Sequence, residues 1–302
     1  MTTALTTHFG FLIEKTSLSW SAGHIEPLVN HATIVQQTLG SKRCYNGWFH
    51  PPLEPVARVG AETKEPPETY ALAFSLPATH GLSLNHPAAS DQMAEFLIAL
   101  FGMLKGLILQ KEGWQHFYKC PLKTGSLCDF YATNAEIIKT MNLATNFWLK
   151  NNQNPKICKL IFSAIHWHIF AQLYAHSFEK FNNQYMVLDT CWKLTTLIHS
   201  IKGHVSHPDR AQTMATFLLL SPALSPPRII SAWASRRNDL VHETLYMDEP
   251  VGFAVSQEGH ELQRRLTSFV ARCILGLLGV DNEYTRSSDV SMQTKGFGAF
   301  KP

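Results

Sequence analysis

The 302-residue sequence lacks the short motifs by which many active sites are recognised. It contains no glycine-rich phosphate loop, no G-x-S-x-G turn and no H-E-x-x-H helix. Its six cysteines form no C-x-x-C pair and are scattered through apolar segments. This scatter is typical of reduced thiols in the core of a cytosolic protein, so we expect neither a disulfide framework nor a cysteine-rich zinc site.

Charge and long hydrophobic runs are also sparse. Charged residues make up 16% of the chain and the net charge is +3, which indicates neither a disordered polyelectrolyte nor a densely basic nucleic-acid binder. The most apolar window, Phe96–Leu109, is interrupted by Lys105 and is shorter than the roughly 20 residues that cross a bilayer. The first residues lack the basic start and apolar run of a signal peptide. We therefore expect a soluble cytoplasmic protein without membrane contacts.

The first half of the chain has a mixed character. Gly10–Trp20 and Thr69–Pro77 have the partial alternation of strands, and proline-rich segments lie between them. Helical patterns follow, from Asp91 as an N-cap to about Gly113 and then over Asn134–Lys150. The turn-forming segment Asn151–Pro155 predicts a boundary, so residues 1–150 are expected to form an accessory or sensing region.

The second half has the pattern of a helical bundle. Proline and glycine punctuation predicts helices over Pro155–Phe181, Tyr185–Ile201, Arg210–Leu220, a helix capped by Ser225 and begun by Pro226, and Glu258–Leu278. Gly279 is a natural stop for the last of them. We therefore predict an α+β protein with a helical domain at residues 151–280 and a flexible tail at residues 281–302.

One predicted helix carries polar residues inside an apolar pattern. In Ser231–Tyr246, Arg237 falls at the centre of an apolar stripe, where a guanidinium is costly unless it is paired or faces a polar site. Asn238 lies at the edge of the stripe, and His242 follows it by one helical turn. In a straight helix Arg237 and His242 point about 140° apart. Either the helix kinks between them, or a second copy of the chain completes the site.

The segment Arg237–His242, RNDLVH, resembles the Arg-(four to six residues)-His motif of HEPN domains, the higher eukaryotes and prokaryotes nucleotide-binding family. Many members carry a polar residue, often Asn, directly after the Arg, as Asn238 does here. The predicted helix order over about Pro155–Val280 is also similar to that of the family, as a bundle of four to five helices. Thr244 stands where members regulated by adenylylation carry Tyr, so that regulation is not expected.

The resemblance implies a metal-independent endoribonuclease that acts as a homodimer through its helical domain. It implies that Arg237 binds the scissile phosphate, that His242 is a general acid or base, and that Asn238 orients the histidine or the phosphate. Asp189 is the expected acidic partner of Arg237. Arg236 is expected off the stripe, facing solvent or the RNA backbone.

These expectations leave other functions open. The alternative is a catalytically inactive HEPN-like scaffold that dimerises or binds a nucleotide or a partner, with Arg237 merely buried against Asp189. A toxin or defence effector silenced by an antitoxin or another regulatory partner is a further possibility. We expect no cofactor and no metal, because the histidines at positions 199, 204 and 207 lack a completing ligand at suitable spacing.

Overall fold

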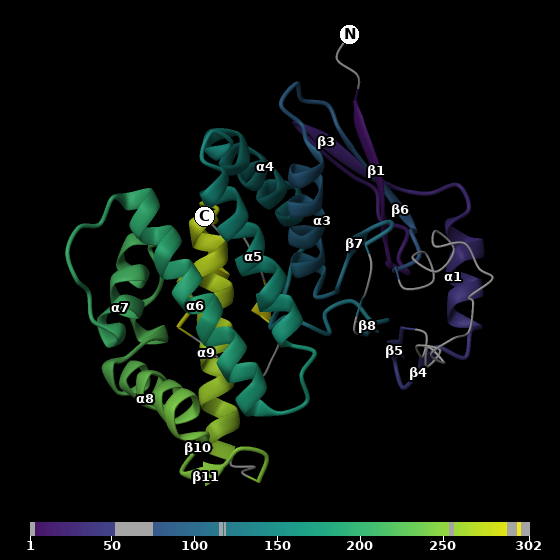
Figure 1. The fold of residues 1–302 in the computed structure, drawn as a ribbon. Helices are drawn as coiled ribbons and strands as arrows, with labels where there is room; N and C mark the ends of the chain where they lie inside the picture. Colours follow the sequence, from purple (N-terminus) through teal and green to yellow (C-terminus); the bar gives the residue numbers. More distant parts are fainter. Residues whose placement is uncertain are drawn as a thin grey trace, which may run out of the picture. The chain divides into compact units, whose positions relative to one another are not determined.

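The computed structural model describes residues 4–51, 75–114, 117, 119–253, 257–288 and 295–296. The chain divides into two compact units, Met1–Leu127 and Cys128–Pro302. The first contains the main sheet and the second most of the helices, which confirms the predicted α+β class (Figure 1). The division falls earlier than the expected boundary at residues 150 and 151, so the helix over Asn134–Asn151 belongs to the helical unit.

The first unit is built on an antiparallel sheet of strand order β2-β3-β6-β1-β7. The strands span β1 Leu5–Gly10, β2 Leu18–Trp20, β3 Gly23–Pro27, β6 His80–Leu84 and β7 Gln110–Lys111. A smaller sheet joins β4 Cys44–Tyr45, β5 Trp48–Phe49 and β8 Cys120–Pro121, and helix α1 covers His31–Leu39. The expected strand at Gly10–Trp20 was wrong in extent, because β1 ends at its first residue. Most of the other expected strand, Thr69–Pro77, lies outside the described residues.

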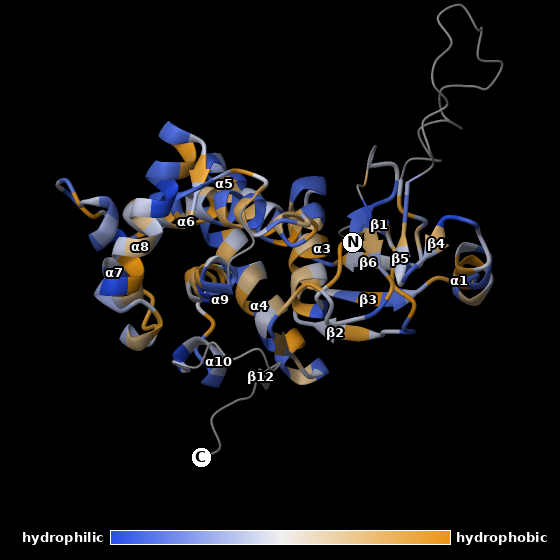
Figure 2. Cartoon of the chain, turned by 90° about the horizontal axis from the view of Figure 1, so that it is seen from below, coloured by the Kyte–Doolittle hydropathy of each residue, from blue (hydrophilic) through white to orange (hydrophobic). Residues whose placement is uncertain are grey.

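Helix α3, Asp91–Lys105, packs against this sheet and is hydrophobic along much of its length (Figure 2). Its N-cap is Ser90, whose hydroxyl accepts a hydrogen bond from the Met93 amide, and not Asp91 as expected. The helix ends at Gly106, which adopts a left-handed φ of 61°. A glycine there has no Cβ to oppose the turn, so the helix stops before the expected end near Gly113.

The second unit is a bundle of helices. The helices are α4 Asn134–Asn151, α5 Pro155–Ala171, α6 Ser177–His199, α7 His207–Phe217, α8 Pro227–Asn238, α9 Gln257–Leu277 and the short α10 Glu283–Arg286. A 3₁₀ turn covers Pro222–Leu224, and strands β9 Phe130–Tyr131 and β12 Lys295–Gly296 pair in parallel. Helix α6 packs against α5 and α9 (Figure 1), and the side chains between them form the apolar core. Among the described residues, no helix combines the length and hydropathy needed to cross a bilayer.

The break between α5 and α6 was predicted in the wrong place. The expected break at Asn182–Gln184 lies inside α6, and the chain turns instead between Ala171 and Ser177. Gln184 is fully buried, and its amide bonds both the ring and the carbonyl of His168 at 3.0 Å. Asn183 donates to the Glu179 carbonyl at 2.8 Å. A contact with another helix satisfies the Gln184 amide and a bond within α6 satisfies the Asn183 amide, so neither residue interrupts the helix.

The first part of the expected flexible tail is packed against the bundle. Asn282 caps α10, and the Tyr284 side chain is completely buried. The tail prediction was therefore wrong for Asp281–Arg286, while most of the following residues lie outside the described part of the chain.

Tyr284 is held by a buried network around Arg272 of α9. The Arg272 guanidinium is 0% exposed and donates to the carbonyls of Tyr284, at 2.9 Å, and Ser268, at 3.1 Å. The Asp129 carboxylate accepts hydrogen bonds of 2.6 Å from the hydroxyls of Ser268 and Tyr284, and lies 3.7 Å from Arg272. The network ties the segment before α4 to the segment after α9.

We predict that Arg272→Met lowers the free energy of unfolding by about 3–5 kcal/mol, because it breaks a buried and fully bonded charge network. Arg265→Met on the same helix is the control. Arg265 makes an i,i+4 pair with Glu261 near the surface, where such pairs contribute at most about 1 kcal/mol. Urea unfolding followed by circular dichroism measures both, and equal losses in the two variants would contradict the assigned role.

Candidate functional site

Helix α8 carries the motif and is fixed to α9 by its apolar side. Trp233 is buried and its indole Nε1 donates to the Leu262 carbonyl at 3.2 Å, while Ile230 packs beside it in the core. The N-cap position is Pro226 rather than Ser225, and no side chain caps this end. The motif at the other end of α8 is therefore anchored against the first turns of α9 (Figure 1).

The helix changes register inside the motif. Asp239–Glu243 form a π-helical turn that continues directly from α8. A π turn bonds residues five apart, so it stacks positions that an α-helix separates around its circumference. Arg237 Nη1 consequently lies 3.5 Å from His242 Nε2. A local change of the helix, the first of the two expected solutions, brings the two side chains together within one copy of the chain.

The motif side chains lie at the surface. Arg237 is half-buried, and both Asn238 and His242 are exposed. Arg237 Nη1 donates to Asn238 Oδ1 at 3.1 Å, so the amide orients the arginine. The expected apolar stripe does not survive the register change, because Val241 is 51% exposed. Arg237 is therefore not a core residue.

Of the two arginines, Arg236 is the one that forms ion pairs within the chain. Its Nη1 lies 2.9 Å from Asp239 and 3.2 Å from Asp248, and its side chain is only 22% exposed. The expectation that Arg236 faces solvent or RNA was wrong in this respect. The bridge ties the start of the π turn to the hairpin that follows it.

That hairpin closes the motif. Strands β10 Leu245–Tyr246 and β11 Glu249–Pro250 are joined by Met247 and Asp248, which both have positive φ, of 57° and 64°. Two such residues give the tight turn that suits the twist of a hairpin. Tyr246 is buried and donates to the Gly259 carbonyl at 2.9 Å, and burial raises the pKa of its hydroxyl to about 12. The π turn is thus held at both ends by contacts with α9.

Asp189 does not pair with Arg237. Its Oδ1 lies 3.0 Å from Arg210 Nη1 and 4.0 Å from His207 Nδ1, both on α7. The expected partnership was therefore wrong, and Arg210 and His207 were missed as neighbours of the site. Burial raises the pKa of Tyr185, one turn before Asp189 on α6; Asp189 raises it further, whereas the charges of Arg237 and Arg210 lower it. These charges lie in one neighbourhood across α6, α7 and α8.

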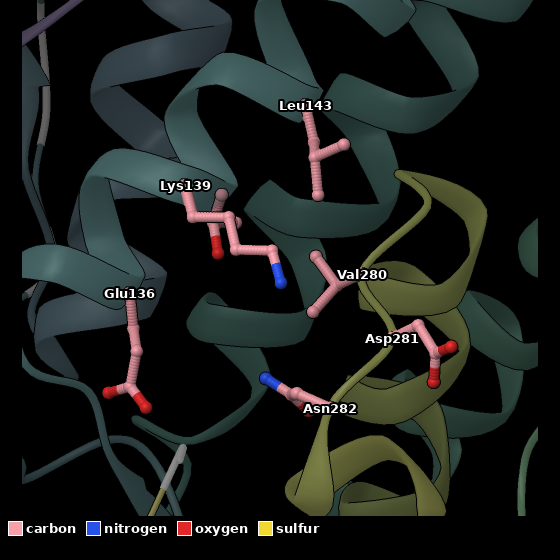
Figure 3. A pocket seen from close by; sticks show the side chains of 7 residues that line it. Glu136, Lys139, Leu143, Val280, Asp281 and Asn282 are labelled. Atoms are coloured by element: carbon pink, nitrogen blue, oxygen red, sulfur yellow. The ribbon is translucent and has the colours of Figure 1, made fainter. Parts of the chain in front are cut away.

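Two hollows in the described part of the chain lie away from the motif. A hollow of about 20 Å³, room for about one water, is lined by α4 residues such as Glu136 and Lys139 and by Val280–Asn282 (Figure 3). A shallower hollow in the first unit is lined by α1 and the segment around Ile13. Within the described residues, no three His, Cys, Asp or Glu side chains are grouped as a metal site requires. Neither of these two hollows includes a motif residue, and the exposed π turn is the candidate site because Arg237 and His242 meet there.

Comparison of the sequence with protein-family models, with curated proteins and with solved structures finds no significant match. A functional proposal for this chain therefore rests on the geometry of its own residues.

We predict that Arg236→Ala loosens the motif, whereas Arg228→Ala does not. Arg236 forms ion pairs with two carboxylates, and a partly exposed network of this kind contributes roughly 1 kcal/mol to local stability. Arg228 is an exposed arginine on the first turn of the same helix and serves as the control. Amide hydrogen exchange over residues 239–250 should accelerate about five-fold in the first variant only. Unchanged exchange in Arg236→Ala would contradict the bridging role.

Proposed function

We propose that the helical unit is a metal-independent endoribonuclease of the HEPN type. The observation that carries the proposal is the 3.5 Å approach of Arg237 Nη1 to His242 Nε2 on an exposed turn. The resemblance in the sequence required these two side chains to act together, and a straight helix would have kept them apart. The packing of α5, α6, α8 and α9 supports the family's bundle arrangement.

The chemistry follows from the two side chains. Arg237 can donate two parallel hydrogen bonds to the scissile phosphate and stabilise the charge that develops on it. His242 can remove the proton of the neighbouring ribose 2′-hydroxyl. The 2′-oxygen then attacks phosphorus, the bond to the 5′-oxygen breaks, and that oxygen takes up a proton. The products carry a 2′,3′-cyclic phosphate and a free 5′-hydroxyl.

The surroundings of Arg237 suit this role. Its hydrogen-bond acceptors are the Asn238 side-chain oxygen and His242 Nε2, and no carboxylate in the described part of the chain lies within ion-pair distance of it. Its positive charge is therefore available to a phosphate. A toxin or antiviral-defence effector restrained by an antitoxin or other partner is the biological setting that we infer for such an activity.

We predict that His242→Ala lowers the rate of RNA cleavage about 10²–10⁴-fold, the usual loss on removing a general acid or base. The side chain is exposed, so the melting temperature should stay close to that of the parent. Arg237→Ala should also abolish cleavage. The assay uses labelled RNA in excess EDTA, with analysis of the product ends.

His176→Ala is the matched control, since His176 is also an exposed histidine of this unit and should leave the rate unchanged. Two results would count against the nuclease and favour an inactive scaffold: parental rates in the His242 variant, or equal cleavage of DNA, which has no 2′-hydroxyl.

We also predict that the chain is a homodimer at micromolar concentration, joined near the motif. Val241 and Phe253 are 51% and 85% exposed beside the motif hairpin, and apolar side chains gathered there suit a self-complementary contact. Sedimentation equilibrium should give twice the chain mass, and Val241→Glu should shift it toward the monomer. A parent protein that sediments as a monomer would refute the dimer.

A further inference from the structure

Helix α7 begins beside the middle of α6, although it follows α6 in the sequence. Segment 200–206 returns along α6, so that His207 and Arg210, on the first turn of α7, lie level with Asp189. At the far end of α7, Phe217 lies against His199, the last residue of α6. The two helices therefore run side by side in the same direction, and the start of α7 lies in the neighbourhood of the motif.

Arg210 fixes the tautomer of His207. An arginine can only donate hydrogen bonds, and Arg210 Nη1 lies 3.0 Å from Asp189 Oδ1 and 3.2 Å from His207 Nδ1. Nδ1 of His207 must therefore be the acceptor, so in the neutral ring the proton is on Nε2. That nitrogen has no hydrogen-bond partner in the described part of the chain, and the side chain is 44% exposed. His207 thus presents a fixed N–H donor to solvent.

The Nε2–H donor of His207 lies near the arginine of the motif. Burial lowers the pKa of His207, and the positive charges of Arg210 and Arg237 lower it further, against the opposing effect of Asp189. Helix α7, which carries His207, packs against α8, which carries Arg237. Burial and Asp189 raise the pKa of Tyr185 on α6, and the charge of Arg237 lowers it against them. The lowered pKa of His207 favours the neutral ring, and its Nε2–H group lies in the same surface neighbourhood as the arginine of the motif.

We propose that His207 is a second phosphate-binding residue, whose Nε2–H donates to a backbone phosphate adjacent to the one bound by Arg237. The inference rests on the proposed function, which supplies the RNA backbone as the ligand. Arg210 and Asp189 act as positioning residues that hold the ring. The substrate then has at least two adjacent backbone phosphates in contact with one copy of the chain.

Two substitutions of His207 distinguish the roles of its two ring nitrogens. His207→Asn places an oxygen near Nδ1, which can still accept from Arg210, but leaves nothing at Nε2. His207→Gln places an N–H donor near Nε2. We expect the Asn variant to bind RNA about 10- to 100-fold more weakly, the effect of losing a hydrogen bond to a charged group, and the Gln variant to recover most of that loss. His199→Asn, an exposed histidine at the other end of the same helix pair, is the control.

The probe is a fluorescein-labelled mixed-sequence oligonucleotide with 2′-O-methyl riboses, which cannot undergo attack by a 2′-hydroxyl. Fluorescence anisotropy at several salt concentrations gives the affinity and its salt dependence. Loss of a neutral donor should leave the salt dependence of the Asn variant as in the parent, whereas Arg237→Ala should reduce the slope by about one. In cleavage assays, KM should rise in the Asn variant with little change in kcat.

The outcomes separate this inference from the ribonuclease proposal. If the parent cleaves RNA and His207→Asn leaves both the affinity and KM unchanged, the phosphate contact is refuted and the nuclease stands. If the parent binds the probe through His207 but does not cleave RNA, the contact stands and the nuclease fails. A parent that does not bind the probe refutes the contact, as does a Gln variant as weak as the Asn variant.

Discussion

A buried charge constrains the helical unit more than any apolar contact does. Arg272 lies in the C-terminal third of α9 with no exposure to solvent, and a guanidinium without partners there would cost several kcal/mol. Asp129 and Tyr284 approach it from the two ends of the unit, so α9 cannot slide or rotate without stranding the charge. Helix α9 in turn offers the backbone carbonyls to which Trp233 and Tyr246 donate. The position of the motif is therefore set by a network that contains none of the motif residues.

The spacing of the motif is a second constraint. Five positions separate Arg237 from His242, which is one residue too many for side chains stacked along an α-helix and the correct number for a π turn. Such a turn gives up regular helical bonds and is stable only when its ends are held. Here Arg236 holds its start and the buried Tyr246 anchors the hairpin after it. The side chains that hold the turn in place, Arg236 and Tyr246, are therefore different from the side chains proposed to act on RNA, although they are interleaved in the sequence.

How much the sequence predicts depends on whether the deciding contact is local. The helix at Asn134–Asn151, capped by Thr133 and Glu136, and the last long helix before Gly279 were predicted because capping and glycine punctuation act within a few residues. The break placed at Asn182–Gln184 failed because Gln184 is satisfied by His168 on another helix. The motif grouped Arg237 with His242, and the two side chains lie 3.5 Å apart. The helical-wheel projection that placed Arg237 in the apolar stripe failed because it assumed one helical register throughout.

Asp189 shows why the pairing of charges around the site lay beyond the sequence pattern. Its partner depends on how segment 200–206 returns along α6, and no local signal encodes that path. The outcome has a chemical logic. Asp189 forms an ion pair with Arg210, and Asp239 and Asp248 form ion pairs with Arg236. A phosphate and a carboxylate compete for the same guanidinium, so an arginine already paired with an acid is a poor phosphate ligand. Because these neighbouring acids are paired with Arg210 and Arg236, Arg237 is bonded only to the Asn238 amide and the His242 ring and can bind an anion.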